Sequence, residues 1–145
     1  MMNIGRKMAS AGAALLAVAG LVTATAPTAH AEGSYNIMIS TRITQFWADY
    51  CLLTTTSGNG RAACSGNKWK FNDFRLGTVH NTGDRVWLDI NIVGGKDRKG
   101  IDLRGMHYIE VKGDLAFVEV CGYRSLDAVA KGEKPLNLHG PGCAG

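Results

Sequence analysis

The chain has 145 residues, with 16 lysines and arginines against 12 aspartates and glutamates, and a formal net charge of +4. This length indicates one ordinary domain with a core of its own. The small net charge argues against a protein that neutralises many phosphates of a nucleic acid, because such proteins carry clustered lysines and arginines.

The first 31 residues have the layout of a secretory signal peptide. Arg6 and Lys7 form a charged start, residues 11–22 (AGAALLAVAGLV) are apolar, and Ala29 and Ala31 place small residues at the −3 and −1 positions of a cleavage site. The apolar run is too short for a bilayer core, which needs about 20 residues. We therefore expect a secreted, extracellular domain over residues 32–145. The Ala/Gly-rich segment resembles the signals of high-GC Gram-positive bacteria.

Removal of residues 1–31 would also change the charge of the chain. Arg6 and Lys7 leave and all 12 acidic residues stay, so the net charge falls from +4 to +2. A net charge of +2 gives only weak electrostatic attraction to a nucleic-acid duplex or an anionic membrane. We expect neither a nucleic acid nor a membrane as a partner of the mature chain.

The beginning of this domain has a mixed pattern. Tyr35, Ile37 and Ile39 alternate like a strand. Residues 42–53 are ambiguous, because Ile43, Phe46 and Tyr50 recur at helical spacing while the abundance of threonine and aromatic residues favours a strand. A short helix is slightly preferred there, with a strand as the alternative.

Two hairpins are predicted in the middle of the chain. Residues 73–80 and 84–93 would form the first, with a loop at Asn81-Thr82-Gly83. Its register would place Leu76 opposite Leu88, and it would also place charged and large residues opposite one another on the other face. The other expected pairs are Thr78 with Val86, Phe74 with Ile90, Arg75 with Asp89, and Gly77 with Trp87.

The second predicted hairpin turns at Gly113-Asp114. Val111 would then face Ala116, Ile109 would face Val118, and His107 would face Val120. Residues 101–104 are expected to add a short strand, so that 73–121 would form a meander. Ser125 is a candidate cap for a short helix over residues 126–131.

Four cysteines, Cys51, Cys64, Cys121 and Cys143, lie after the predicted cleavage site. An even count in a short exported chain predicts two disulfides. The sequence allows three pairings, and we favour Cys51–Cys64 with Cys121–Cys143 because sequence-local pairs meet most easily. No pair has the spacing of a zinc site, and we expect no metal or other cofactor.

Catalytic candidates are weak. In a strand, His107 and Glu110 point to opposite faces and could not act together. Glu110 and Glu119 would lie diagonally on one face, where two carboxylates could serve as acid and base of a glycosidase-like hydrolase. An RNase-like reaction using His107, Glu110 and Arg124 is a further alternative. We expect no enzyme, because His107 and Glu110 are separated by facing and because glutamates such as Glu110 and Glu119 are common on the solvated sheet face of small exported β domains.

The densest positive charge lies in residues 94–100, with Arg104 just beyond. Lys96, Arg98, Lys99 and Arg104 are therefore the candidate binding residues, since charged loops on a rigid scaffold commonly carry recognition. Trp87, with Arg75 and Arg85, forms either a contact patch or the packing side of a second sheet, and packing is preferred for Trp87.

These features predict an all-β fold, a small disulfide-linked antiparallel β-sandwich or barrel with one or two short helices. We expect a secreted, non-catalytic module that binds another extracellular protein, as an adaptor subunit of an extracellular assembly such as an antibacterial toxin particle. The alternatives are an inhibitor of an extracellular enzyme and a small secreted hydrolase.

Overall fold

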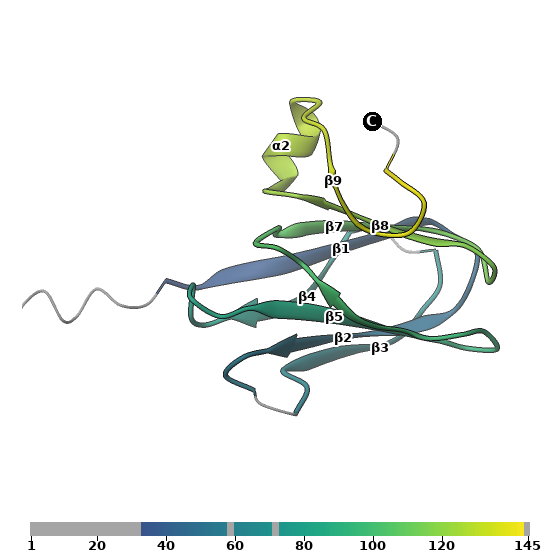
Figure 1. Cartoon of the computed structure of the whole chain (residues 1–145), viewed down its shortest axis with the longest axis horizontal. Coiled ribbons are helices and arrows are strands. Elements are labelled where there is room, and N and C mark those ends of the chain that lie inside the picture. Colours follow the sequence, from purple (N-terminus) through teal and green to yellow (C-terminus); the bar gives the residue numbers. More distant parts are fainter. Residues whose placement is uncertain (1–32, 58–59, 71–72, 144–145) are drawn as a thin grey trace, which may run out of the picture. The chain divides into compact units, whose positions relative to one another are not determined.

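Nine strands form two sheets within residues 33–57, 60–70 and 73–143, which are the residues that the computed structural model describes (Figure 1). Sheet A has the strand order β4-β1-β7-β8-β9, and sheet B has the order β3-β2-β5-β6. The predicted signal peptide, residues 1–31, lies outside the described residues. The elements are β1 (Tyr35–Thr44), β2 (Ala48–Thr54), β3 (Ala63–Lys68), β4 (Phe74–Val79), β5 (Val86–Ile92), β6 (Arg98–Asp102), β7 (Tyr108–Gly113), β8 (Val118–Tyr123), α2 (Leu126–Ala130) and β9 (Leu136–His139).

The core lies between the two sheets. In β5, Val86, Leu88, Ile90 and Ile92 are buried while Trp87 and Asn91 are only half-buried, so the strand has an inner and an outer face. Sheet A supplies the opposite wall of the core. Its buried apolar residues are Ile37, Ile39, Leu76, Val79, Ile109, Val111, Val118 and Val120. The fold is an all-β sandwich with one tiny helix, as predicted; the pairing of β1 with β7 is parallel, whereas the prediction was antiparallel.

The first predicted hairpin is wrong, although both of its strands exist. β4 pairs with β1 in sheet A, and β5 pairs with β2 and β6 in sheet B, so Leu76 and Leu88 belong to different sheets. None of the five predicted pairs forms, and the predicted meander over 73–121 is divided between the sheets. The turn residues are nonetheless used, because Asn81 Oδ1 accepts a hydrogen bond from the N–H of Gly83 at 2.9 Å. A turn of this kind, between two strands that alternate inward apolar residues, is compatible with a hairpin and equally with a connection from one sheet to the other.

Residues 42–53 form strands, so the preferred helix is wrong and the alternative is correct. β1 ends at Thr44 and β2 begins at Ala48, and the short connection between them passes from sheet A to sheet B. This crossing shifts the phase of the alternation. Phe46 and Tyr50 are buried, while Ile43 and Trp47 are exposed. The apparent helical spacing therefore comes from a turn between two strands.

The second hairpin forms with a different register. Val111 pairs with Val120 and Gly113 with Val118, so the loop spans residues 114–117. Asp114 stabilises this longer loop, because its Oδ1 accepts hydrogen bonds from the N–H groups of Ala116 at 2.8 Å and Phe117 at 3.0 Å. The register differs from the prediction by an even number of residues, so the expected apolar residues still share the inner face.

The C-terminal predictions agree better with the structure. Ser125 caps α2, and its side chain accepts a hydrogen bond from the N–H of Ala128. The expected short strand at 101–104 is β6, which begins earlier, at Arg98. Disulfides join Cys51 to Cys64 and Cys121 to Cys143, which is the favoured pairing.

Candidate binding face on the four-stranded sheet

The outer face of sheet B is the candidate site. The main contacts of this sheet with elements outside it are those of β2 and β3 with β4 and of β6 with β9, which belong to the opposite sheet. α2 lies on the side of sheet A (Figure 1). Among the described elements, the main contacts of sheet B are thus with sheet A; on its outer face Asp49, Trp87 and Asn91 are half-buried, and Cys51 and Asp89 are buried.

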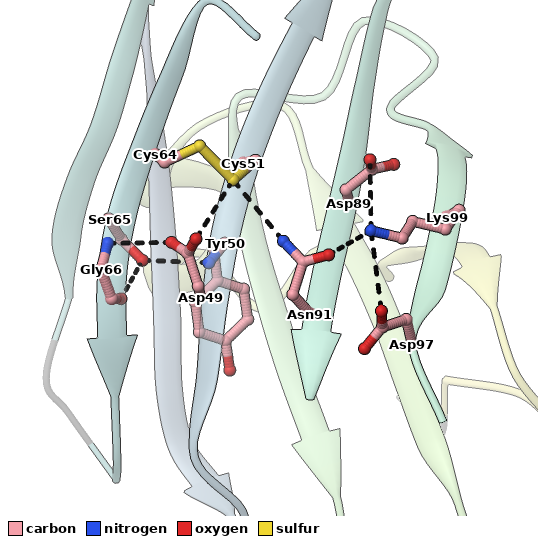
Figure 2. Close-up of a disulfide and its surroundings, with 10 residues drawn as sticks. All are labelled: Asp49, Tyr50, Cys51, Cys64, Ser65, Gly66, Asp89, Asn91, Asp97 and Lys99. Carbon is pink, nitrogen blue, oxygen red and sulfur yellow. Dashed lines mark hydrogen bonds and ion pairs between the residues drawn. A yellow bond between two sulfur atoms is a disulfide. The ribbon is translucent and has the colours of Figure 1, made fainter. Parts of the chain in front are cut away.

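The Cys51–Cys64 disulfide lies on this face and joins directly opposite residues of β2 and β3 (Figure 2). Asp49 lies beside it, with Oδ2 at 3.5 Å from Cys51 Sγ, and Asp49 Oδ1 accepts a hydrogen bond from the N–H of Gly66 at 2.9 Å. On the other side, Asn91 Nδ2 lies 3.7 Å from Cys51 Sγ. Asp49 and the two cysteines are grouped closely enough for a metal ion, but both sulfurs are in a disulfide and offer no thiolate ligand.

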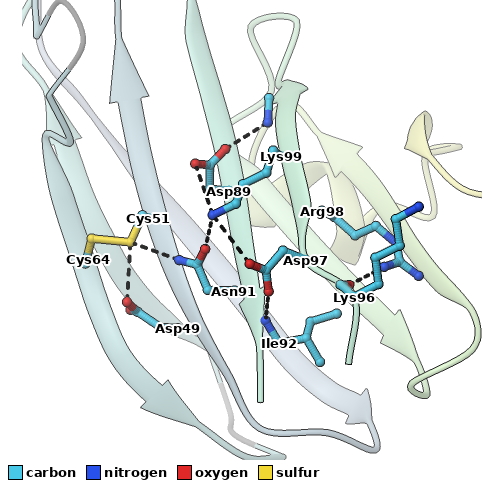
Figure 3. Close-up of polar contacts among 11 residues, drawn as sticks. Asp49, Cys51, Cys64, Asp89, Asn91, Ile92, Lys96, Asp97, Arg98 and Lys99 are labelled. Atoms are coloured by element: carbon cyan, nitrogen blue, oxygen red, sulfur yellow. Dashed lines mark hydrogen bonds and ion pairs between the residues drawn. A yellow bond between two sulfur atoms is a disulfide. The ribbon is translucent and has the colours of Figure 1, made fainter. Parts of the chain in front are cut away.

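Lys99 is the centre of the polar contacts on β5 and β6 (Figure 3). Its Nζ donates to Asn91 Oδ1 and lies 3.9 Å from Asp89 Oδ2 and 3.7 Å from Asp97 Oδ2. Both carboxylates are themselves held by the backbone. Asp89 Oδ1 accepts from the N–H of Gly100 and Asp97 Oδ1 from the N–H of Ile92, each at 2.8 Å. The ammonium group is therefore held in place by neighbours whose own positions are fixed.

An aromatic and charged group occupies the other end of the face. The guanidinium of Arg85 lies 5.2 Å from the ring centroid of Trp87, and Arg85 Nη2 lies 2.8 Å from Asp102 Oδ2. Asp102 accepts hydrogen bonds from the side chain of Arg85 and from the N–H of Arg104. These bonds hold the pKa of the Asp102 carboxyl below its usual range. The preferred packing role of Trp87 is wrong, because alternation in β5 directs Val86 and Leu88 inward and Trp87 outward.

The four predicted binding residues do not form one patch. Lys96 is exposed in the turn between β5 and β6, and Lys99 lies on the outer face. Arg98 is half-buried, donates to the carbonyl of Lys96, and lies close enough to His139 to contribute, after burial, to the lowered pKa of that imidazole. Arg104 follows the far end of β6, with a positive φ of 50°. Arg98 pairs with the inward Ile90, and as consecutive strand residues Arg98 and Lys99 point to opposite faces of the sheet.

The carboxylates considered for hydrolysis have a lysine between them. Lys112 Nζ lies 3.0 Å from Glu110 Oε1, and Lys112 pairs across the strands with Glu119. His107 stacks on Tyr35, with ring centroids 4.0 Å apart, and burial lowers the pKa of the imidazole. These contacts are those of ion pairs and packing on a sheet.

A second cluster of polar side chains, beside sheet A, was not predicted from the sequence. Tyr108 donates its hydroxyl proton to Asp73 Oδ1 at 2.9 Å, and Asp73 Oδ1 lies 3.2 Å from Arg42 Nη2. Burial is the main cause of the raised pKa of Tyr108. These three residues lie far apart along the chain, and no spacing or motif relates them.

Comparisons with family models, with curated proteins and with solved structures find no significant match to this chain. Within the part of the chain that the structure describes, no helix is long and apolar enough to span a membrane.

Proposed function

We propose that this protein is a secreted, non-catalytic module that binds another extracellular protein through the outer face of sheet B. The observation that carries this proposal is that Trp87 points outward with Arg85 over its ring, on the same face as the charged side chains of Asp89, Asp97 and Lys99. Hydrogen bonds and ion pairs hold these three side chains in place. Tryptophan and arginine are the residue types that most often dominate the energy of protein interfaces.

The fixed charges favour binding for an entropic reason. Side chains that must be immobilised in a complex each cost about 0.5–1.5 kcal/mol. Asp89, Asp97 and Lys99 are already held by backbone and side-chain contacts. A partner that contacts this face would lose less entropy than one that contacts mobile lysines.

The compartment is part of the same proposal. The layout of residues 1–31 supports a bacterial secretory signal, and two disulfides are compatible with an oxidising extracellular environment. Among extracellular roles, we propose an adaptor subunit of a larger assembly, of the antibacterial toxin type, with an enzyme inhibitor as the alternative.

The test is co-purification of partners from the culture fluid of a producing strain. We expect the wild-type chain to co-purify with larger proteins, and the double variant Arg85→Glu with Trp87→Ala to lose them. The matched control is Arg75→Glu, which changes an exposed arginine of sheet A. Recovery of the wild-type chain only as a free monomer would contradict the adaptor role.

The inhibitor alternative gives a different result. An inhibitor should keep its full potency against its enzyme as a lone domain, and it should lose that potency when one exposed loop is cleaved. An adaptor would not inhibit the enzyme in that assay. The inhibition assay on the purified domain therefore distinguishes the two roles.

A further inference from the structure

One end of the sandwich exposes apolar side chains that the proposed binding face does not include. Of the eight large hydrophobic residues that are exposed in the described part of the chain, six lie at this end. We define the loop end by these six residues: Ile43, Trp47, Trp69, Val93, Leu115 and Phe117. We propose that the loop end docks on the surface of a phospholipid membrane that contains anionic lipids.

The loop end is assembled from four separate connections. Trp47 lies between β1 and β2, Trp69 follows β3, Val93 follows β5, and Leu115 and Phe117 lie between β7 and β8. Figure 1 places the turns after β1, β5 and β7 at the same end of the two sheets. No stretch of sequence shows this gathering, because each turn contributes only one or two apolar residues.

Contacts connect these turns into one surface. The rings of Trp47 and Trp69 have centroids 5.8 Å apart, and the N–H of Val93 donates to the carbonyl of Trp47 at 2.9 Å. A Cβ atom at Gly95 would lie 3.0 Å from Leu115 Cδ2, which places the turn after β5 against the loop after β7. These contacts place the turns that carry Trp69, Trp47, Val93 and Leu115 next to one another.

The side chains are exposed although their backbones are held. Phe117 is 67% exposed and Trp47 is 51% exposed. Asp114 holds the loop of Phe117 with two hydrogen bonds, and the N–H of Gln45 donates to the carbonyl of Gly113 at 2.8 Å. Apolar groups presented in this way by a rigid frame can enter the boundary between headgroups and acyl chains, where tryptophan is the preferred residue.

The charges at this end complement an anionic surface. Asp73 is paired with Arg42 and Asp97 with Lys99, whereas Asp114, which accepts hydrogen bonds from backbone N–H groups of its own turn, keeps its negative charge. Lys70, which follows Trp69, and Lys96, three residues after Val93, are exposed and outnumber this unpaired carboxylate. Each lysine near an anionic leaflet adds to binding, and the effect decreases with salt. The sequence alone predicted no membrane partner, because charge was considered without this apolar surface.

The experiment uses tryptophan fluorescence of the full chain. Its three tryptophans are Trp47, Trp69 and Trp87, so Trp87→Phe leaves emission only from the loop end. With vesicles of phosphatidylglycerol and phosphatidylcholine, we expect a blue shift and quenching by brominated lipids. We expect weaker binding to phosphatidylcholine alone and to the mixed vesicles at high salt.

Variants separate the loop end from the rest of the chain. Phe117→Asp should lower the affinity for the mixed vesicles by about tenfold or more, because it removes one of the side chains that would be buried. Lys96→Glu should lower it by roughly fivefold. The matched control is Leu126→Asp, which changes an exposed leucine of α2, away from the loop end, and should change nothing. Circular dichroism confirms that each variant is folded.

Three outcomes would overturn the proposal. They are no binding to anionic vesicles, binding in which the tryptophans are not quenched, and equal loss of binding in Phe117→Asp and Leu126→Asp. The second outcome would assign the binding to the apolar N-terminal segment, which contains no tryptophan. Loss of a protein partner in Arg85→Glu does not bear on these results, because Arg85 belongs to the other site.

Discussion

The carboxylate of Asp89 accepts a hydrogen bond from the N–H of Gly100 at 2.8 Å, across the bulge that interrupts the pairing of β5 with β6. This side chain replaces a missing backbone acceptor in the ladder. Asp89→Ala should lower the free energy of unfolding by about 1–2 kcal/mol, because it leaves the Gly100 donor without that partner. Urea denaturation measures the difference. Asp89→Asn retains an acceptor oxygen and should cost less, and Asp127→Ala on the exposed face of α2 should cost almost nothing.

Replacing Tyr50 is expected to stabilise the fold, in contrast to replacing Asp89. Its side chain is fully buried, and no described residue is a hydrogen-bond partner of its hydroxyl oxygen. Burial also raises the pKa of this phenol. A buried hydroxyl without a partner costs about 1–3 kcal/mol, so Tyr50→Phe should raise the thermal midpoint. A lower midpoint for Tyr50→Phe would mean that the hydroxyl is satisfied in solution.

The stacked pair of His107 and Tyr35 makes stability depend on pH. Burial lowers the pKa of His107 below the usual value near 6.5. The unfolded chain therefore takes up a proton at a higher pH than the folded chain, so stability is fully present above about pH 6.5 and decreases as the pH falls towards the folded pKa.

His107→Asn should flatten the dependence of the urea midpoint on pH over this range, and NMR titration of the imidazole reports the lowered pKa directly. His80→Asn, at an exposed histidine, is the control. A dependence that is unchanged in His107→Asn would assign it to other groups, first of all to His139, whose pKa is lowered by burial and by Arg98.

The two disulfides should contribute differently to local order. Each closes a short loop, with sequence separations of 13 and 22 residues, and should stabilise the fold by about 3 kcal/mol in the chain-entropy model. Replacing Cys121 and Cys143 by alanine should also increase amide exchange in β9, because β9 is an edge strand between these cysteines. Replacing Cys51 and Cys64 should leave exchange in β9 unchanged relative to the global stability.

Several strand positions could be predicted from local signals, and the favoured one of three disulfide pairings is correct. Val86, Leu88 and Ile90 alternate strictly, and turn residues lie on both sides of β5. Strand partners could not be predicted in the same way. Leu76 and Leu88 face the core whether their strands pair or lie in opposite sheets, and alternation cannot distinguish these arrangements.

The candidate surfaces were less predictable than the fold. Trp87 and Lys99 lie on one face because of the pairing of β5 with β6, whereas Arg98, the residue before Lys99, pairs with the inward Ile90. Trp47 and Trp69 become neighbours only when β1, β2 and β3 are in place. Such contacts depend on the order of strands in the sheets, which has no local signature.

The parallel pairing of β1 with β7 has a consequence for how the chain acquires its structure. Ile39 of β1 aligns with Ile109 of β7, and the other neighbour of β1 is β4. β1, the earliest strand among the described residues, therefore lacks its β7 neighbour until the second half of the chain is available, and sheet A cannot be complete before then. Contacts of this range make folding slow, and a nascent chain therefore stays without a complete sheet A until β7, β8 and β9 have been made.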